Sequence, residues 1–300
     1  MIDRRLGIIR PKPKKKFFNY DTPVETYEYK KLKKTVYVKR DDLFGRDPAP
    51  HLAKLRGIKK YVDKMDAKGV TVLGDMDTRV SKSGWGLACA CVDTNIKPLV
   101  FYPKLKEQTE LPPIQQKAKL LGAEIVPLQA MRTASMCYRA KKITEGKGGV
   151  MMPMGLTLRE TVEEVAKVVK GMDKEYFEGD VVVCTGTGTI CAGIIAGLME
   201  SNIKPNHLFG VSCGMSTGRQ AKVIEGLLGE YFNSDAMDDV KIHRLPRYVQ
   251  LIVPSMDYYD INTIETPFPC NSYYDKKAWW FLMNFMKGMK DKILFWNVGD

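Results

Sequence analysis

The sequence has 300 residues, a formal net charge of +12, 44% hydrophobic residues and 27% charged residues. A chain of this length and composition can bury one large core or two smaller ones, which distinguishes it from disordered and fibrous proteins. It contains no uncharged apolar run of about 18 residues that would predict a membrane span. Its basic N-terminus lacks the apolar segment of a secretory signal.

The cysteines and histidines argue against a disulfide framework and against a metal site. The number of cysteines is odd, and no two of them have C-x-x-C spacing. Reduced thiols in a cytoplasmic protein fit this pattern best. The three histidines are scattered, so we expect no metal and no histidine triad. The cysteines are Cys89, Cys91, Cys137, Cys184, Cys191, Cys213 and Cys270.

The positive charge is concentrated near the N-terminus. Residues 1–60 contain 18 Lys and Arg residues against 7 Asp and Glu residues, a net charge of +11. One interpretation is contact with the phosphates of a nucleic acid. The other is a solvated basic arm, of which the segment KPKKK at residues 12–16 is typical.

After a basic arm at residues 1–34, the predicted elements alternate between strands and helices. Pro11 and Pro13 discourage helix within the arm. Such an alternation predicts an α/β protein with mostly parallel sheet. The predicted strands lie at 35–40, 70–74, 97–103, 124–128, 180–186, 207–214 and 293–298. The predicted helices lie at 51–66, 83–95, 112–123, 131–144, 157–172, 191–200, 217–229 and 275–290.

A glycine-rich loop follows the most apolar strand. In VVVCTGTGTICAG, the strand runs into Gly186, Thr187, Gly188 and Thr189 and then into a helix. Glycines allow close approach of the backbone, and the amides at a helix N-terminus favour an anion such as phosphate. The Walker pattern and the complete dinucleotide fingerprint are both missing, so a single phosphomonoester is the expected ligand. The alternative is a tight turn without a ligand.

Three blocks of sequence resemble the fold type II pyridoxal-phosphate (PLP) enzymes, and most closely the 1-aminocyclopropane-1-carboxylate deaminase and D-cysteine desulfhydrase group. The first is VKRDDLFG followed by LAKLRG, the second is GTGTICAG, and the third is CNSYYDKKAWWF with ILFWNVGD. The blocks occur in the family's order and span about residues 36–300.

The resemblance implies PLP as cofactor, held as an aldimine by Lys54 with its phosphate on Gly186–Thr189. It implies a large PLP-binding domain built from 35–68 and 150–300 and a small domain at 69–149. Both would be open, mostly parallel αβα units, with the cofactor in the cleft between them. Homodimers are usual in this family.

The third block implies roles for two further residues. Asp275 is a candidate to face the pyridine nitrogen of PLP, where a carboxylate keeps the ring protonated. Tyr274 is a candidate acid/base or substrate-facing group. The alternative for Asp275 is a helix N-cap, and both roles are compatible.

The segments expected to bind substrate depart from the family pattern. The family's S-N-x-T-R is here Asp75-Met76-Asp77-Thr78-Arg79, so only the last two residues match. The family's G-G-N before the lysine is here Pro50–Ala53. In an alternative alignment of the substrate-binding segment, the asparagine beside the cofactor becomes Gly84. The ending H-T-G-G becomes Asn297–Asp300. The candidate substrate-binding residues are Thr78, Ser81, Ser83 and Trp85, with Ser83 also a catalytic candidate.

For two of these candidates, ordinary structural roles stay open. Ser81 and Ser83 can equally cap the helix that follows them. Trp85 can line the pocket or simply pack.

Three functions are compatible with these residues. The first is a PLP-dependent lyase, deaminase or transferase that acts at Cα or Cβ of an amino-acid substrate by deamination, elimination or β-replacement. The second is a PLP enzyme acting on an amino acid attached to DNA, as in viral hypermodification of thymine. The basic N-terminal 60 residues would then contact DNA in the host cytoplasm. The third is a degenerate PLP fold that only binds.

Overall fold

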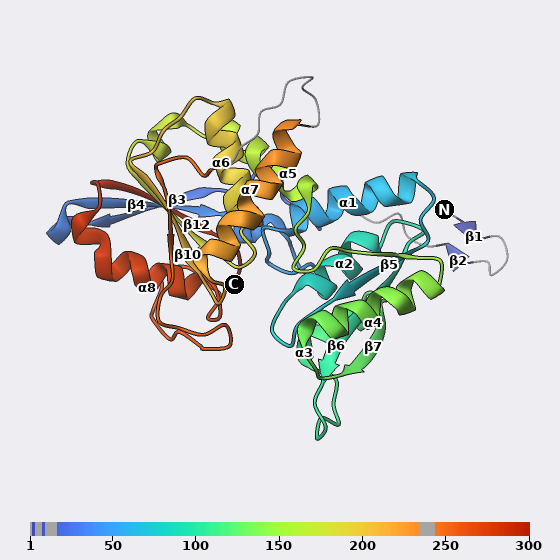
Figure 1. The fold of residues 1–300 in the computed structure, drawn as a ribbon. Coiled ribbons are helices and arrows are strands. Elements are labelled where there is room, and N and C mark those ends of the chain that lie inside the picture. The colour runs from blue at the N-terminus through green and yellow to red at the C-terminus, as the bar shows by residue number, and fades with distance from the viewer. Residues whose placement is uncertain (1, 4–7, 10–16, 234–243) are drawn as a thin grey trace.

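The computed structural model describes residues 2–3, 8–9, 17–233 and 244–300, and it contains two parallel sheets with helices on their faces (Figure 1). The predicted α/β class is confirmed. The KPKKK segment lies outside the described residues, so the proposed contact between this segment and DNA stays a prediction. Among the described helices, none is both long and apolar enough to cross a membrane.

The larger sheet has six strands in the order β11-β10-β9-β12-β4-β3. All neighbours are parallel except β3, which pairs antiparallel with β4 at the edge. The prediction of an arm reaching residue 34 was therefore wrong, since the alternating segment VETYEY forms an edge strand. The strands are β3 (Val24–Tyr29), β4 (Lys34–Arg40), β9 (Asp180–Thr185), β10 (His207–Ser212), β11 (Val249–Ile252) and β12 (Lys292–Asn297).

The smaller sheet has four parallel strands in the order β7-β6-β5-β8. A separate antiparallel pair is formed by β1 (Ile2–Asp3) and β2 (Ile8–Ile9). The strands of the smaller sheet are β5 (Val72–Met76), β6 (Lys97–Lys104), β7 (Glu124–Gln129) and β8 (Val150–Met151).

The helices begin and end within a few residues of the predicted bounds. The largest difference is at the end of α8, which stops at Phe285 and continues as a 3-10 helix to Gly288. At the start of α1, Leu52 forms a β-bridge with Gly299 and the helix begins only at Leu55. The α-helices are α1 (Leu55–Ala67), α2 (Ser83–Cys91), α3 (Pro113–Leu120), α4 (Thr133–Gly146), α5 (Arg159–Lys170), α6 (Thr189–Glu200), α7 (Thr217–Asn233) and α8 (Asp275–Phe285). Short 3-10 helices lie at Lys30–Leu32, Asp41–Phe44, Lys174–Phe177 and Met286–Gly288.

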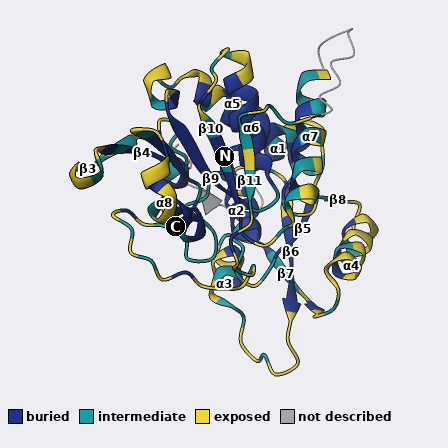
Figure 2. Cartoon of the chain, turned by 60° about the vertical axis from the view of Figure 1, so that its left-hand side comes forward, coloured by how far each residue is buried: buried dark blue, intermediate teal, exposed yellow. Residues whose placement is uncertain are grey.

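Both faces of the larger sheet are buried, which explains the continuous apolar run of β9. Side chains alternate along a strand, so Val181 and Val183 join the core formed with α5, α6 and α7. Val182 and Cys184 point the other way and join the core formed with α8. The dark blue central strands in Figure 2 show this burial. Parallel strands covered on two sides need no polar face.

A buried ion network fixes the position where α1 begins. Asp41 accepts hydrogen bonds from Arg56 (Nε to Oδ1, 2.9 Å) and from the indole of Trp296 (3.3 Å). Both charged side chains are almost completely buried, and the guanidinium also stacks over the ring of Phe44 at 4.5 Å. Asp41 of the VKRDD block therefore joins the end of β4 to β12 and to the helix start that carries Lys54.

Arg56→Met is expected to destabilise the protein by about 3–5 kcal/mol, because it leaves the buried Asp41 carboxylate without its cation. The matched control is Lys292→Met, which breaks an exposed pair with Glu178 and should cost less than about 1 kcal/mol. Urea unfolding of both variants measures the difference. Equal losses would show that the Asp41–Arg56 pair is no more important than a surface pair.

Candidate active site

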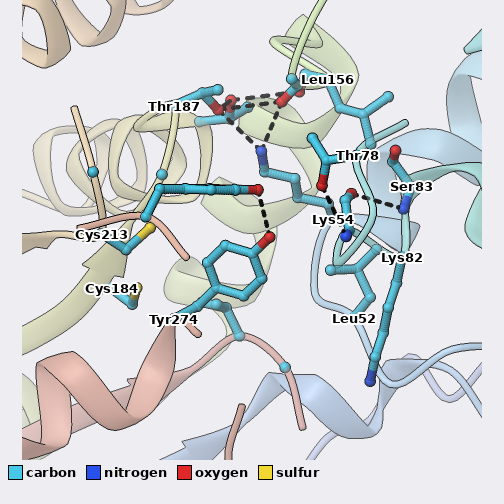
Figure 3. Close-up of a pocket in the computed structure, with 18 of the residues that line it drawn as sticks. Leu52, Lys54, Thr78, Lys82, Ser83, Leu156, Cys184, Thr187, Cys213 and Tyr274 are labelled. Carbon is cyan, nitrogen blue, oxygen red and sulfur yellow. Dashed lines mark hydrogen bonds between the residues drawn. The ribbon is translucent and has the colours of Figure 1, made fainter. Parts of the chain in front are cut away.

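A cavity of about 300 Å³ lies where the carboxyl ends of strands from both sheets meet. The segments after β5, β9, β10 and β12 contribute to its wall, together with the start of α1. Open parallel sheets present loops and ligands at this edge. Figure 3 shows Lys54, Thr78, Ser83, Thr187 and Tyr274 arranged around it.

Lys54 immediately precedes α1 and directs its amine toward the glycine-rich loop (Figure 3). Its Nζ donates to the carbonyl of Gly155 (2.8 Å) and to Oγ1 of Thr187 (3.0 Å). Burial lowers the pKa of Lys54 to about 8, and no carboxylate forms an ion pair with it among the described residues. About a tenth of the lysine is then neutral at pH 7, which a nucleophilic amine requires.

The glycine-rich loop has the geometry of a phosphate cradle. Gly188 has a φ of +89°, and a Cβ there would lie 2.6 Å from Ile224, so only glycine fits. The next residue, Thr189, begins α6, and its hydroxyl lies 3.0 Å from that of Thr187. The free amides of the first helical turn, its dipole and two hydroxyls thus converge on one edge of the cavity.

Asp275 is buried at the start of α8, and only one of its two carboxyl oxygens accepts a hydrogen bond from the described residues. Oδ1 accepts the backbone N–H of Val298 at 2.9 Å, whereas Oδ2 has no hydrogen-bond partner among the described residues. Burial raises the pKa of this carboxyl well above its usual range. A cationic donor in the cavity, such as a protonated pyridine nitrogen, would satisfy Oδ2 and stabilise the ionised form.

A pair of tyrosines forms another part of the wall. The hydroxyls of Tyr274 and Tyr258 are 2.6 Å apart, and the two rings meet edge to face. Burial raises the pKa of both phenols, so each keeps its proton near neutral pH. The pair can donate a hydrogen bond into the cavity but carries no charge.

Ser83 connects two buried carboxyl groups, Asp75 and Asp77. Its hydroxyl oxygen lies 2.6 Å from Asp75 Oδ2 and 3.0 Å from Asp77 Oδ1. A hydroxyl has one hydrogen, so it donates to only one of them; the other contact is a hydrogen bond only if that carboxyl is protonated and donates to serine. Burial is the largest influence on both acids and raises the pKa of each. The two acids therefore share one proton near neutral pH.

Each acid has a neighbour that favours its ionised form. Asp77 also accepts from the backbone N–H of Thr78 (2.8 Å) and from the amide of Gln115 (3.1 Å). The charge of Lys54 favours an ionised Asp75. Burial nevertheless raises the pKa of Asp77 to about 8 and that of Asp75 to about 6, so one of the two acids holds a proton near neutral pH and Ser83 connects it to the other.

His51 and Asp300, which both replace other residues of the family pattern, contact each other. The His51 ring nitrogen and the Asp300 carboxylate form an ion pair, and Lys82 Nζ lies 2.8 Å from the same carboxylate. The hydrogen bond to Asp300 raises the pKa of His51, whereas His51 and Lys82 lower the pKa of Asp300 to about 2. Asp300, which follows β12, is thus joined to the segment before α1 through His51 and to the start of α2 through Lys82.

The structure brings most of the candidate residues from the sequence to one cavity. Trp85 is the exception: its indole donates to the carbonyl of Pro48 at 2.9 Å and its ring packs with Val100 and Ala118. The packing alternative therefore describes Trp85, and the interpretation as a pocket residue was wrong. The candidates that line the cavity are Lys54, Thr78, Ser81, Ser83, Gly186, Thr187, Gly188, Thr189, Tyr274 and Asp275.

The helix-cap alternatives for the two serines have different outcomes. Ser81 Oγ accepts the backbone N–H of Ser83 at 3.1 Å, as expected for a helix start. The Ser83 hydroxyl is instead engaged by the acids. For Asp275, a cap bond to its own helix is not formed, because Oδ1 bonds Val298.

Several cavity residues were not identified from the sequence. Cys184 and Cys213 line the floor, and Tyr258 comes from a long loop with no regular pattern. Asp77 was visible only as a departure from a family motif. A Cβ at Gly84 would lie 2.4 Å from Val100 and 2.9 Å from Asp77 Oδ2, so no asparagine fits there.

The cavity suits PLP. It offers a partly neutral lysine, a phosphate cradle and an unpartnered buried carboxyl oxygen, which match the aldehyde, phosphate and ring nitrogen of that cofactor. The fold and the site thus define a PLP-dependent enzyme.

Comparison with known proteins agrees with this conclusion. The chain is 30% identical over 290 residues to a curated protein of Pseudomonas phage M6, described as a glycyl-dTMP PLP-dependent decarboxylase; the match covers 93% of this chain and 99% of the relative. The chain belongs to the family of that PLP-dependent enzyme. No family model matches the sequence.

Solved structures confirm the fold type II architecture. A homologue of ACC deaminase superposes with a TM-score of 0.77 at 18% identity, covering 95% of this chain and 90% of its own. Threonine deaminase isoform 2 from Solanum lycopersicum superposes with a TM-score of 0.64 at 16% identity, covering 93% of this chain and 78% of its own. The predicted fold and cofactor are therefore confirmed.

Asp275→Asn is expected to weaken PLP binding by about 10- to 100-fold, because a charge-assisted hydrogen bond contributes about 1.5–3 kcal/mol. Fluorescence titration of the apoprotein with PLP measures the affinity. Asp173→Asn, on an exposed turn, is the control and should bind PLP normally. Unchanged affinity in Asp275→Asn would contradict a role at the ring nitrogen.

Asp75→Asn tests the shared proton through stability. The folded protein holds a proton that the unfolded chain releases above pH 4 or so, where a free aspartate ionises. Wild-type stability should therefore fall as pH rises from 5 to 8, by up to about 1.4 kcal/mol per pH unit. In Asp75→Asn, an amide N–H replaces the shared proton, so the decline should be smaller.

Urea unfolding at several pH values measures this dependence. Asp93→Asn, at an exposed position just beyond α2, should keep the wild-type slope. Parallel curves for wild type and Asp75→Asn would mean that the acids are ionised in the folded protein.

Proposed function

We propose that this enzyme is a PLP-dependent lyase that decarboxylates an amino-acid moiety carried on a thymidine nucleotide, as part of DNA modification. The observation that carries the proposal is the match along nearly the whole chain to a phage enzyme whose description names that reaction and a glycyl-dTMP substrate. The site supports it, since its wall provides a buried proton donor beside Lys54. The transferase alternative has no comparable support.

The chain's own residues perform distinct tasks in this reaction. Lys54 would hold the cofactor covalently through its amine until the amine of the substrate takes its place. Gly186–Thr189 would bind the phosphate, and Asp275 would hold the ring nitrogen. Bound PLP supplies an electron sink for the negative charge that develops at Cα. Tyr258 and Tyr274 stay neutral and orient groups without adding charge.

Decarboxylation also requires a proton for Cα, and the Asp75–Ser83–Asp77 group supplies it. The bond between Cα and the carboxylate breaks, CO₂ leaves, and the electron pair stays on the Cα side. Ser83 lines the cavity and gives its hydroxyl proton to Cα. The protonated acid of the pair then reprotonates Ser83, and the ionised acids regain a proton from solvent. General acids in such positions typically contribute about 10²–10⁴-fold to the rate.

The remaining expectations form part of the same proposal. We assign the large domain to 35–68 and 150–300 and the small domain to 69–149. The smaller sheet supports this division except at its end, because its strand β8 extends to Met151. The described cysteines are all free, which supports a reducing cytoplasm, that of a host cell if the source is viral. A homodimer is the family's usual state.

The test is incubation of the holoenzyme with a glycine-bearing thymidine nucleotide in D₂O. We expect release of CO₂ and incorporation of one deuterium at Cα. Ser83→Ala should lower kcat by about 10²-fold or more, because the proton donor is lost. Ser135→Ala, at an exposed position on α4, is the control and should leave kcat unchanged. Release of ammonia without CO₂ would instead make the enzyme a deaminase.

A further inference from the structure

Three exposed cations surround the mouth of the cavity on the side of the smaller sheet. Arg79 follows Thr78 after β5, Lys104 follows Pro103 at the end of β6, and Arg132 precedes Thr133 at the start of α4. Each of these cations is thus next in sequence to a residue that lines the cavity. Because β5, β6 and β7 are parallel neighbours, their carboxyl ends bring the three segments to one edge (Figure 1). We call Arg79, Lys104 and Arg132 the basic rim.

The basic rim is not neutralised by the protein. No carboxylate pairs with any of the three among the residues that the structure describes. Some cations elsewhere on the surface do have such partners: Lys97 and Lys147 both contact Glu124, and Lys170 contacts Glu200. Exposed charges of one sign beside a cavity attract an anionic ligand.

The opposite side of the mouth offers an aromatic face. Tyr259 lines the cavity and is 58% exposed, and its ring stands perpendicular to that of Tyr258, with centroids 4.9 Å apart. Met154, another lining residue, is 48% exposed. Cations that bind a phosphate backbone, combined with an exposed aromatic ring on which a base can stack, are typical of surfaces that bind single-stranded nucleic acid.

We propose that the basic rim binds the phosphates of a single DNA strand while one modified nucleotide enters the cavity past Tyr259. This inference rests on the proposed function and specifies its substrate as a polynucleotide. A base attached to a strand can reach a buried reactive group only when it is turned out of the stack. The rim lies outside the N-terminal segment that the sequence suggested for DNA contact, so the two surfaces are separable.

The test is binding of a fluorescent single-stranded oligonucleotide to the full-length holoenzyme, followed by anisotropy over a range of KCl concentrations. For single strands, each lost phosphate contact lowers the log–log salt slope by about 0.7, and affinity at 0.1 M salt by about fivefold. The triple variant R79Q/K104Q/R132Q should therefore lose about 100-fold in affinity and about 2 units of slope.

The control is K119Q/R139Q/K204Q, which removes the same charge from exposed cations away from the cavity and should bind almost as the wild type. Both triples are repeated in a K14Q/K15Q/K16Q background, so that contacts of the N-terminal segment cannot mask the effect. PLP content, measured by absorbance, should be unchanged in all variants.

The outcomes separate this inference from the proposed function. Equal DNA affinity of the rim triple variant and the control triple variant would refute the proposal that the basic rim binds DNA. The rim proposal would also be overturned if the wild-type enzyme bound no DNA and efficiently decarboxylated a free glycine-bearing nucleotide. The proposed reaction would still stand in that case. Loss of DNA binding in the rim triple, without decarboxylation of either substrate by the wild type, would support the rim and refute the reaction.

Discussion

The buried ion pair between Asp41 and Arg56 is the contact on which the site depends most. It joins the end of β4 to the first turn of α1, and the indole of Trp296 attaches β12 to the same carboxylate. Lys54 lies two residues before Arg56, so its reach toward Thr187 is set by this network. The charged residues of the VKRDD block thus act on chemistry indirectly, by positioning a lysine that they do not touch.

A second constraint is the burial of the ionisable groups in the cavity wall. Burial lowers the pKa of Lys54 and raises those of Asp75, Tyr258, Tyr274 and Asp275, which in every case favours the neutral form. Buried groups respond strongly to the charge that a ligand brings, because little water screens it. The ring nitrogen and phosphate of the cofactor, and the carboxylate of the substrate, would be those charges. The charged rim lies outside, at the mouth.

The parts of the fold and site that could be predicted from the sequence are those encoded by contiguous sequence motifs. The buried strand β9, the glycine loop and the lysine before α1 are contiguous segments with characteristic residues. The edge strand β3 was missed because the basic residues around it resemble those of a solvated arm. Its pairing with β4 depends on tertiary contact and not on composition.

The proton-sharing group could not be predicted in the same way. Asp75 and Asp77 were recognisable only as replacements in a family motif, and their meaning depends on the position of Ser83 between them. Tyr258 lies in an irregular loop and meets Tyr274 across 16 residues. Trp85, a candidate substrate-binding residue, packs with Val100 and Ala118 instead. Direction of a side chain, unlike residue type, requires the packed structure.

The central claim is that Lys54 is the residue that carries the cofactor. Borohydride reduction of the purified holoenzyme, followed by proteolysis and mass spectrometry, tests it most directly. The account predicts a visible absorbance band that disappears on reduction and a single phosphopyridoxyl group on the peptide containing Lys54. Both should be missing from Lys54→Ala and present in Lys59→Ala. A phosphopyridoxyl group on another lysine, or a protein that cannot be loaded with PLP, would contradict it.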